Sequence, residues 1–238
     1  MIHLLDRFHP IHQLEKKRAA LIAEGNLPEP IAELLSKPYP LPDAKLNELE
    51  FLVFDLETTG LDPKKDRILS IGHLSIHNML VDISTSVHTY IKAEKYVKPE
   101  VAIINHIVPE MLSEGQLFDA AMLDLFRAMK GKILIAHGTI VEKNFIDTYV
   151  KLRFDLEPLP LLWLDTLILE KSLLRNKNDT GTGDFQLASV RKRHNLPPYL
   201  AHNALSDSIA TGELFLVLVK TIYGKNTALL NGMYKPIY

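Results

Sequence analysis

An apolar run that starts at Phe51 contains two acids, Asp55 and Glu57, and no other polar residue before Thr58. Such a short run is typical of a buried β-strand, in which side chains alternate between the two faces. The two acids therefore point the same way, with their Cα atoms roughly 6.5 to 7 Å apart. A carboxylate among apolar groups is unfavourable unless it is protonated, paired with a cation or bound to a metal. The run thus predicts either a buried strand with a metal-binding pair or an edge strand whose acids face solvent.

Further strand and helix patterns follow this first run. The strand patterns cover residues 68–77, 81–91, 132–136 and 162–165. The helical patterns cover residues 119–129, 141–153, 166–174, 186–194 and 203–223. Antiparallel strands joined by a short step, followed by alternating helices and strands, predict a mixed α/β sheet of five strands flanked by helices.

Residues 1–48 have a pattern of their own. Two short helical stretches, at residues 11–24 and 29–36, precede a segment at residues 37–43 that contains three prolines. Proline lacks a backbone donor and blocks a helix, so this segment predicts an extended connector. We therefore expect a short helical N-terminal extension over residues 1–48, available to a protein partner, and a main domain over residues 49–238.

The composition narrows the possible classes of protein. The 238 residues include no cysteine, which excludes disulfide scaffolds, thiolate zinc sites, iron–sulfur clusters and cysteine nucleophiles and fits a reducing cytosol. The strongly apolar run from Leu214 to Val219 is far shorter than the roughly 20 residues of a membrane span. The N-terminus shows no signal-peptide pattern. We expect a soluble, cytoplasmic protein without membrane contact.

The charge of the chain is nearly balanced. Its net charge is −2, from 27 basic and 29 acidic residues, so it lacks the positive charge of a general polyanion binder. Any nucleic-acid contact must therefore be local. One basic stretch, from Lys171 to Arg193, holds six Lys or Arg and two Asp. This stretch predicts either a solvated helix face and loop or a patch that follows phosphates.

Two short motifs surround the acidic pair and add a histidine and a further acid. The sequence DLETTG at residues 55–60 puts two threonines and a glycine after the acids, and HNALSD at residues 202–207 puts His202 five residues before Asp207. Both motifs resemble those of the DEDDh family of 3′–5′ exonucleases, which includes the proofreading epsilon subunit of bacterial replicative polymerase, ribonuclease T and oligoribonuclease. The resemblance extends over about residues 51–220 and implies a ribonuclease H-like fold.

The middle motif of this family departs from its usual form here. Family members carry H-N-A-x-F-D-x-x-F-L, and alignment on His137 and on the pair Phe145 and Ile146 puts Glu142 in the place of the aspartate. The rival is Asp147, five residues later and about 140° away around a helix. Glu142 shares the core-facing stripe with the apolar pair, so we predict it as the third acid. The alternative is a partly exposed glutamate that the helix dipole favours at a helix start.

Four acids and one histidine define the candidate site. Asp55, Glu57, Glu142 and Asp207 offer only oxygen ligands, which suit Mg²⁺ or Mn²⁺ and not zinc. The resemblance implies two such cations, one generating the attacking hydroxide and one steadying the leaving 3′ oxygen of an in-line displacement. An imidazole with an ordinary pKa of about 6.5 accepts a proton from water at neutral pH, so His202 is the expected general base.

The resemblance also implies residues that bind substrate. By resemblance, Thr58 and Thr59 contact the 3′ nucleotide, Gly60 permits its close approach and Ile107 wedges the terminal base. Plain core packing is the other interpretation of Ile107. Phe145 is expected among the substrate-binding residues as well. Contacts of this kind hold sugar, phosphate and stacked bases, so we expect a weak sequence preference.

These observations together predict a divalent-metal-dependent 3′–5′ exonuclease that hydrolyses single-stranded DNA or short oligonucleotides to nucleoside 5′-monophosphates. Single-stranded 3′ ends are its expected partner. An RNA-trimming exoribonuclease is the alternative within the family, because the motifs are the same, and dependence on the 2′-hydroxyl separates the two. A catalytically weak nucleic-acid-binding module is the alternative of a different class, because Glu142 departs from the motif.

Overall fold

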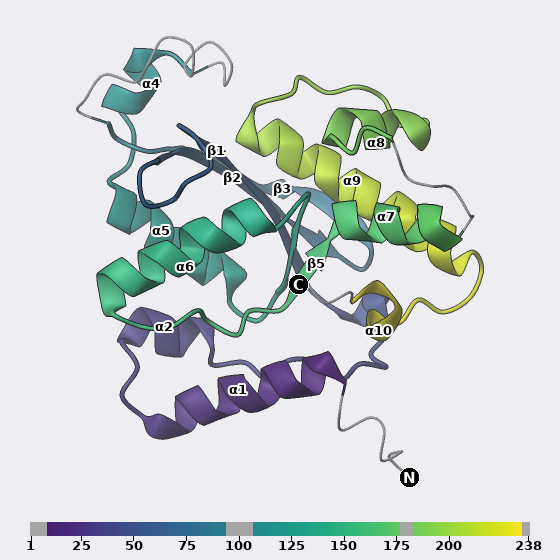
Figure 1. Ribbon diagram of the computed structural model, residues 1–238, viewed down its shortest axis with the longest axis horizontal. Coiled ribbons are helices and arrows are strands. Elements are labelled where there is room, and N and C mark those ends of the chain that lie inside the picture. Colours follow the sequence, from purple (N-terminus) through teal and green to yellow (C-terminus); the bar gives the residue numbers. More distant parts are fainter. Residues whose placement is uncertain (1–8, 94–106, 177–182, 235–238) are drawn as a thin grey trace.

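One mixed sheet with strand order β3-β2-β1-β4-β5 runs through the centre of the protein (Figure 1). The structure is a computed structural model that describes residues 9–93, 107–176 and 183–234. The strands are β1 (Phe51–Thr58), β2 (Ile68–His77), β3 (Leu80–Tyr90), β4 (Ile133–Ala136) and β5 (Trp163–Asp165). The helices are α1 (Pro10–Glu24), α2 (Glu29–Leu34), η2 (Leu46–Glu48), α4 (Pro109–Ser113), α5 (Phe118–Met129), α6 (Ile140–Phe154), α7 (Thr166–Asn176), α8 (Leu187–Arg193), α9 (Ala204–Tyr223) and α10 (Leu230–Met233). The predicted five-stranded mixed sheet flanked by helices is confirmed.

The strand β1 lies in the middle of the sheet and sets the position of the acidic pair. It pairs antiparallel with β2 and parallel with β4. Its pairing with β4 ends at Val53 opposite Ile135, so Asp55 and Glu57 extend beyond this ladder. The alternative of an edge strand with solvated acids is therefore wrong. Parallel strands end at the same edge of a sheet, so the chain leaves β1, β4 and β5 near the two acids.

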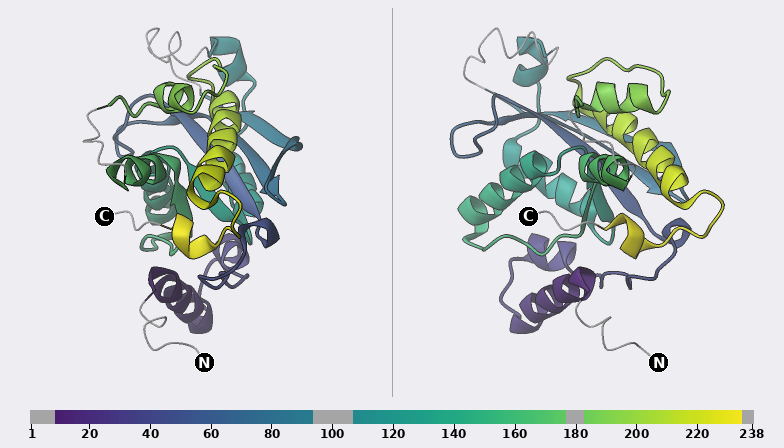
Figure 2. Two further views of the ribbon diagram at one scale, coloured as in Figure 1. Left: turned by 90° about the vertical axis from the view of Figure 1, so that its right-hand side faces the viewer. Right: turned by 45° about the vertical axis from the view of Figure 1, so that its right-hand side comes forward.

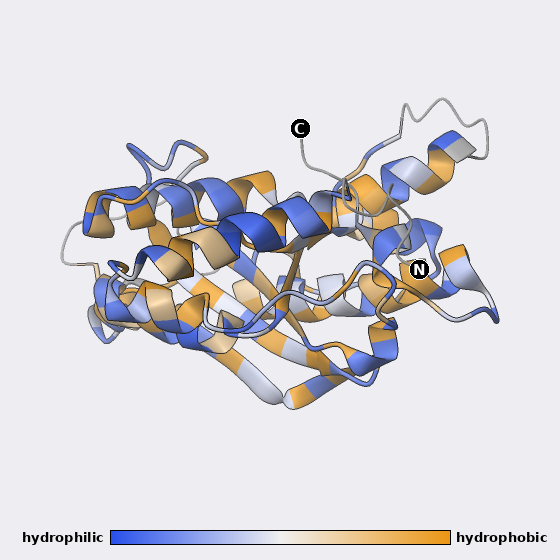
Figure 3. Cartoon of the chain, turned by 90° about the horizontal axis from the view of Figure 1, so that it is seen from below, coloured by the Kyte–Doolittle hydropathy of each residue, from blue (hydrophilic) through white to orange (hydrophobic). Residues whose placement is uncertain are grey.

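Side chains that alternate along β1 contribute to two cores. Phe51 and Val53 belong to the core covered by α7, α8 and α9, whereas Leu52 and Phe54 belong to the core covered by α5 and α6 (Figure 2). In Figure 3 the helices show alternating hydrophobic and hydrophilic bands, as expected for helices with one buried side. Asp55 has the same parity as Phe51 and therefore lies on the side of the sheet that α9 covers.

The described part of the N-terminal extension packs against the main domain. Ile31 of α2 and Ile11 of α1 are fully buried, each in one of the two cores. The connector after α2 is fixed by Tyr39, whose hydroxyl donates to the carbonyl of Pro160 at 2.6 Å. α1 lies at the opposite end of the molecule from α4 and α8 (Figures 1 and 2). The role of the extension towards a protein partner stays a prediction.

The longest described helix, α9, has 20 residues and packs along the sheet through Leu214, Phe215 and Leu218. It also carries Glu213 and Lys220, as expected for a helix that is buried on one side only. None of the helices in the described ranges is long and apolar enough to cross a membrane.

Candidate active site

The turn after β1 is shaped by the threonines and the glycine of the first motif. Thr59 Oγ1 donates to Asp66 Oδ1 at 3.0 Å and accepts from the backbone N–H of Arg67 at 3.0 Å. Thr58 Oγ1 donates to the carbonyl of Gly60 at 2.7 Å. A Cβ on Gly60 would lie 2.5 Å from Asp66 Oδ2, so any larger residue would displace this carboxylate. The first motif therefore builds a turn directly beside the acidic pair.

The first turn of α9 crosses β2 at a glycine. Gly72 pairs with Asp55 across the sheet, and a Cβ on Gly72 would lie 2.2 Å from the backbone of Ala204. Ser208 Oγ is hydrogen-bonded to the carbonyl of Gly72 at 2.8 Å. Since only glycine allows this approach, Gly72 determines how close Asp207 comes to Asp55.

Asp207 also holds the loop that carries His202. Its Oδ2 accepts from the backbone N–H of His202 at 2.8 Å and from that of Asn203 at 3.3 Å. His202 has a φ of 62°, a left-handed conformation that is uncommon for residues other than glycine. The Asn203 side chain caps α9 by accepting from the backbone N–H of Ser206 at 3.0 Å. The loop thus leaves His202 exposed at the border of the site.

Glu142 enters the site from the first turn of α6. It is 4% exposed, and its Oε2 has no hydrogen-bond partner among the described residues. The loop before α6 is fixed by Asp165, whose carboxylate accepts from the backbone N–H groups of Gly138 at 3.0 Å and Thr139 at 2.9 Å. Burial raises the pKa of Glu142 to about 8, and the charge of Asp165 adds to this rise.

The other three acids form a cluster in which one oxygen each of Asp55, Glu57 and Asp207 lies within 4.8 Å of the others. Burial, followed by the charges of Glu142, Glu57 and Asp207, raises the pKa of Asp55 well above its ordinary value. Burial and the charge of Asp207 raise the pKa of Glu57 to about 7. Burial also raises the pKa of Asp207, although two backbone N–H groups oppose the rise. The protein alone therefore disfavours full ionisation of this cluster.

A cleft of about 380 Å³ opens over the cluster. All four predicted acids line it, together with His202 and the turn from Thr58 to Gly60. Of the described residues that line the cleft, none is Lys or Arg. The structure thus brings together every predicted site residue except Ile107 and Phe145.

Ile107 and Phe145 lie in cores. Ile107 is 3% exposed and packs with Leu69 and Leu112 in a small core of its own. Phe145 belongs to the core between the sheet and the helices α5 and α6. Their contact with substrate stays a prediction.

Two other residues near the second motif have structural partners. The rival acid Asp147 does not line the cleft and pairs with Lys143 one turn earlier on α6. His137 lines the cleft, but Nδ1 lies 2.8 Å from Thr166 Oγ1 and Nε2 lies 2.8 Å from the carbonyl of Phe185. A carbonyl only accepts, so we assign the proton to Nε2, and burial lowers the pKa of His137 and keeps the ring neutral. His137 therefore ties the end of β4 to the segment before α8.

The basic stretch from Lys171 to Arg193 includes residues 177–182, which lie outside the described residues. Of its described members, Arg191 and Arg193 form ion pairs with glutamates. Lys171 and Arg193 lie over the ring of Phe185, at 5.1 and 5.3 Å from its centroid. A patch that follows phosphates stays a prediction.

Two residues outside the predicted site, Gly72 and Asp165, also shape the site. Gly72 interrupts a strand pattern, and an isolated glycine in a strand is the signal for a close backbone approach. Asp165 ends an apolar strand, and its carboxylate also accepts from the backbone N–H of Leu167 at 2.9 Å at the start of α7. Sequence periodicity alone assigns neither residue to the site, because both act through contacts between distant segments.

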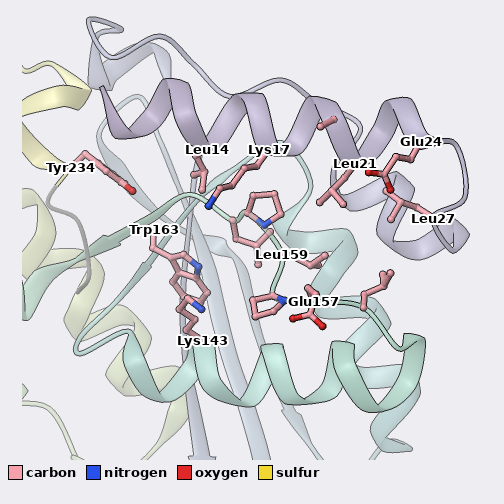
Figure 4. Close-up of a pocket in the computed structure, with 15 residues that line it drawn as sticks. Leu14, Lys17, Leu21, Glu24, Leu27, Lys143, Glu157, Leu159, Trp163 and Tyr234 are labelled. Atoms are coloured by element: carbon pink, nitrogen blue, oxygen red, sulfur yellow. The ribbon is translucent and has the colours of Figure 1, made fainter. Parts of the chain in front are cut away.

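A second cavity, of about 510 Å³, lies between α1 and the segment before β5 (Figure 4). Leu14, Lys17 and Leu21 of α1 face Trp163 and Lys143 across it. None of the four predicted acids lines this cavity, and the metal-ligand cluster found among the described residues lies elsewhere. The candidate chemistry therefore belongs to the smaller cleft over β1.

The donor set of that cleft fits hard divalent cations. Carboxylate oxygens are the ligands that Mg²⁺ and Mn²⁺ prefer. Glu142 has an oxygen without a hydrogen-bond partner among the described residues, and the pKa values of Asp55 and Glu57 are raised. Both features are expected of acids that ionise fully only beside an additional cation. Asp55, Glu57 and Asp207 are placed to bind such a cation, with Glu142 beside them.

The model of a family described as Exonuclease matches residues 52–215, which is more than half of the chain. The chain belongs to the exonuclease family. The match confirms the family that the two motifs predict. It runs from β1 into α9 and so includes all four acids of the cleft.

Relatives of this exonuclease-family chain include proteins of DNA polymerase III. The PolC-type DNA polymerase III of Thermotoga maritima is 30% identical over 193 residues, which cover 81% of this chain and 13% of the relative. The epsilon subunit of DNA polymerase III of Treponema pallidum is 27% identical over 186 residues, which cover 78% of this chain and 84% of the relative. The chain therefore spans a small part of the first relative and most of the second.

Solved structures of other exonucleases share the fold of this exonuclease-family chain. Exonuclease I of E. coli in complex with a dT13 oligonucleotide superimposes with a TM-score of 0.59 at 21% identity, over 73% of this chain and 41% of that chain. Exonuclease X in complex with 5′-overhanging duplex DNA gives a TM-score of 0.55 at 18% identity, over 78% of this chain and 98% of that chain. The likeness confirms the predicted ribonuclease H-like architecture.

Proposed function

We propose that this chain is a divalent-metal-dependent exonuclease that removes nucleotides from the 3′ end of single-stranded DNA as nucleoside 5′-monophosphates. The observation that carries the proposal is the convergence of four acids, from β1, α6 and α9, at one open cleft. A relative is a subunit of DNA polymerase III, and a structure with the same fold holds a dT13 oligonucleotide. Both observations support DNA over RNA as the substrate.

The four acids and one histidine divide the proposed chemistry between them. Asp55, Glu57, Glu142 and Asp207 hold two divalent cations, which supply Lewis acidity and offset the charge of the phosphodiester. His202 is the general base and takes a proton from the attacking water, because its imidazole is exposed at the border of the cleft.

We propose that the 3′ end of the substrate contacts the turn from Thr58 to Gly60. The described lining of the cleft has no Lys or Arg, so a phosphate there depends on backbone N–H groups, hydroxyls and the cations. Such contacts do not distinguish one base from another, and we expect a weak sequence preference. The main domain over residues 49–238 carries this activity, and the extension over residues 1–48 is available to a protein partner.

Matched DNA and RNA oligonucleotides with 5′ labels test the proposal in Mg²⁺, in Mn²⁺ and in EDTA. We expect a ladder that shortens from the 3′ end, faster degradation of DNA than of RNA, and no degradation in EDTA. The variant Asp207→Asn should show no ladder with either metal. Faster degradation of RNA would make the protein an exoribonuclease, and binding without degradation would make it a nucleic-acid-binding module.

A further inference from the structure

The loop between α8 and α9 carries His202, and the earlier half of this loop is bound by a buried arginine of α8. Arg191 is 2% exposed. Its Nη1 donates to the carbonyl of Ala210 on α9 at 2.5 Å, and its Nη2 donates to the carbonyl of Pro197 in the loop at 2.9 Å. Nη2 also pairs with Glu213 Oε2 on α9 at 2.8 Å. One guanidinium therefore joins α8, α9 and the loop.

Tyr199 adds a second contact between the loop and this guanidinium. The Arg191 guanidinium carbon lies 4.8 Å from the centroid of the Tyr199 ring, a cation–π distance. The Tyr199 hydroxyl donates to Glu213 Oε1 at 3.0 Å. Pro197 and Tyr199 lie five and three residues before His202. The arginine and its glutamate thus hold two points of the loop close to the histidine.

The part of the loop before His202 is open to solvent. Every residue from Pro197 to His202 is exposed, and a segment with few buried apolar contacts opens easily. Burial of a guanidinium costs free energy, because the charged group loses its hydration. An apolar side chain of similar volume would pack in the same place without this cost. Among the described residues, the Nε of Arg191 has no hydrogen-bond partner. The contacts of this buried charge with the loop and with α9 therefore point to a role in placement.

We propose that Arg191 is a positioning residue that fixes the loop so that the His202 imidazole stays at the acidic cleft. Asp207 fixes the other end of the loop through the backbone N–H of His202. Two exposed residues separate Tyr199 from His202, so the two anchors leave the histidine little freedom. The inference rests on the proposed function, because its consequence is the rate of proton transfer at His202.

The test compares kcat and KM on a single-stranded DNA 3′ end. Arg191→Met should lower kcat by about 10- to 100-fold and change KM by less than about threefold, because misplacement of a proton acceptor slows chemistry more than binding. Arg191→Lys should recover part of the loss, since lysine keeps the charge and loses the planar fork. Tyr199→Ala removes a side chain that is 41% exposed, so it should fold and lower kcat in the same direction.

Arg18 offers a matched control. It is also buried, at 7% exposed, and donates to the carbonyl of Leu35 at 2.6 Å and to Glu15, far from the loop. Arg18→Met should lower the Tm and leave kcat unchanged. A similar loss of kcat in Arg18→Met and Arg191→Met would reflect general destabilisation and overturn the inference.

A double-mutant cycle separates positioning from a purely structural role. In a His202→Ala background, Arg191→Met should lower kcat by less than about twofold, because the group on which it acts is already gone. Equal losses in both backgrounds would overturn the inference. If Arg191→Met fails to fold, Tyr199→Ala takes its place in the same cycle.

Hydrogen exchange tests the loop without relying on activity. Exchange over residues 194–203 should be faster in Arg191→Met and Tyr199→Ala than in the wild type, and unchanged in Arg18→Met. Unchanged protection of the loop in folded Arg191→Met and Tyr199→Ala would overturn the inference. A wild-type protein that degrades neither DNA nor RNA would instead contradict the proposed function, and the exchange result would still decide whether Arg191 holds the loop.

Discussion

At the scale of single residues, Glu142 is a buried carboxyl whose Oε2 has no hydrogen-bond partner among the described residues. Its pKa is raised to about 8. We predict that Glu142→Gln raises the Tm in EDTA at about pH 9, where wild-type Glu142 is charged, and leaves it nearly unchanged at about pH 6, where Glu142 is protonated. The amide is a poor metal ligand. Mutation of a residue that only supports a metal ligand costs roughly 10- to 100-fold in activity, so loss of the Glu142 carboxylate should lower the exonuclease rate by at least that factor.

Thermal unfolding at the two pH values and a 3′-end degradation assay check both parts of this prediction. Asp207→Asn provides the control, because the wild-type Asp207 carboxylate already accepts two backbone N–H groups. An equal Tm for wild type and Glu142→Gln at about pH 9 would mean that Glu142 has an ordinary pKa.

The length of the Glu142 side chain leads to a second prediction at this scale. Glu142→Asp restores the usual residue of the family but shortens the side chain by one methylene, so its carboxylate should end short of the cation and activity should fall. Mg²⁺ demands near-ideal coordination geometry, so the loss of activity should be larger with Mg²⁺, and Mn²⁺ should restore part of the activity. Asp147→Ala serves as the control, because Asp147 pairs with Lys143 outside the cleft and should be near wild type. An inactive Asp147→Ala beside an active Glu142→Ala would identify Asp147 as the third acid.

At the scale of elements, the crossing of α9 over β2 sets the width of the site. A Cβ on Gly72 would lie 2.2 Å from the backbone of Ala204, so Gly72→Ala must push the start of α9 away from the sheet. Asp207 and His202 move with that helix start, so we predict a loss of activity of about 100-fold, the effect of a displacement of about 1 Å. Degradation kinetics and circular dichroism measure activity and folding in the same samples.

Gly212 is the matched control for this change. A Cβ there would meet Val53 and Val81 at 3.5 Å, an ordinary contact distance, and alanine favours a helix. Gly212→Ala should therefore keep wild-type activity with an equal or higher Tm. Wild-type activity in Gly72→Ala would show that α9 tolerates a displaced start.

The elements also show how far the sequence predicts this structure. Apolar runs and helical periodicity predicted all five strands and the long helices to within a few residues, because each pattern is repeated several times along its element. The short helices η2, α4 and α10 were missed, since three to five residues are too few to show a period. The motifs predicted the acids that line the cleft. Neither patterns nor motifs predicted the anchoring by Gly72 and Asp165, because these contacts join segments that lie far apart in the sequence.

At the scale of the whole molecule, the N-terminal extension shares the cores of the main domain. Ile31 is fully buried and packs in the core that contains Phe54. We predict that Ile31→Ala lowers the free energy of unfolding by about 2 to 5 kcal/mol, as for other large-to-small core changes, and leaves kcat unchanged. Urea unfolding measures the first effect. Ile22→Ala, on the same extension but at a side chain 36% exposed, should be near neutral, and an equal effect of both changes would contradict the prediction.

The acidic cluster makes the stability of the whole molecule depend on pH and on metal. Glu57 and Glu142 have pKa values of about 7 and about 8 in the folded protein against an ordinary 4.5, so the folded state holds their protons longer than the unfolded state. The free energy of unfolding in EDTA should therefore fall as the pH rises from about 4.5 to about 8. Cations that bind the folded state should oppose this decline. Measurement of Tm against pH, once in EDTA and once in Mn²⁺, checks this prediction. If Tm falls with pH equally in EDTA and in Mn²⁺, no cation binds the cluster.

The absence of Lys and Arg from the described lining of the cleft implies an order of assembly. A nucleic-acid strand is a polyanion, and a bare cleft of four acids repels it. Cations that enter first would neutralise the acids and give the terminal phosphate a positive ion to bind. Metal and substrate should then bind in sequence, metal first, and each should raise the affinity for the other, since such coupling is reciprocal. An enzyme of this design would be kept inactive on DNA ends by scarcity of free cations alone, without any inhibitor.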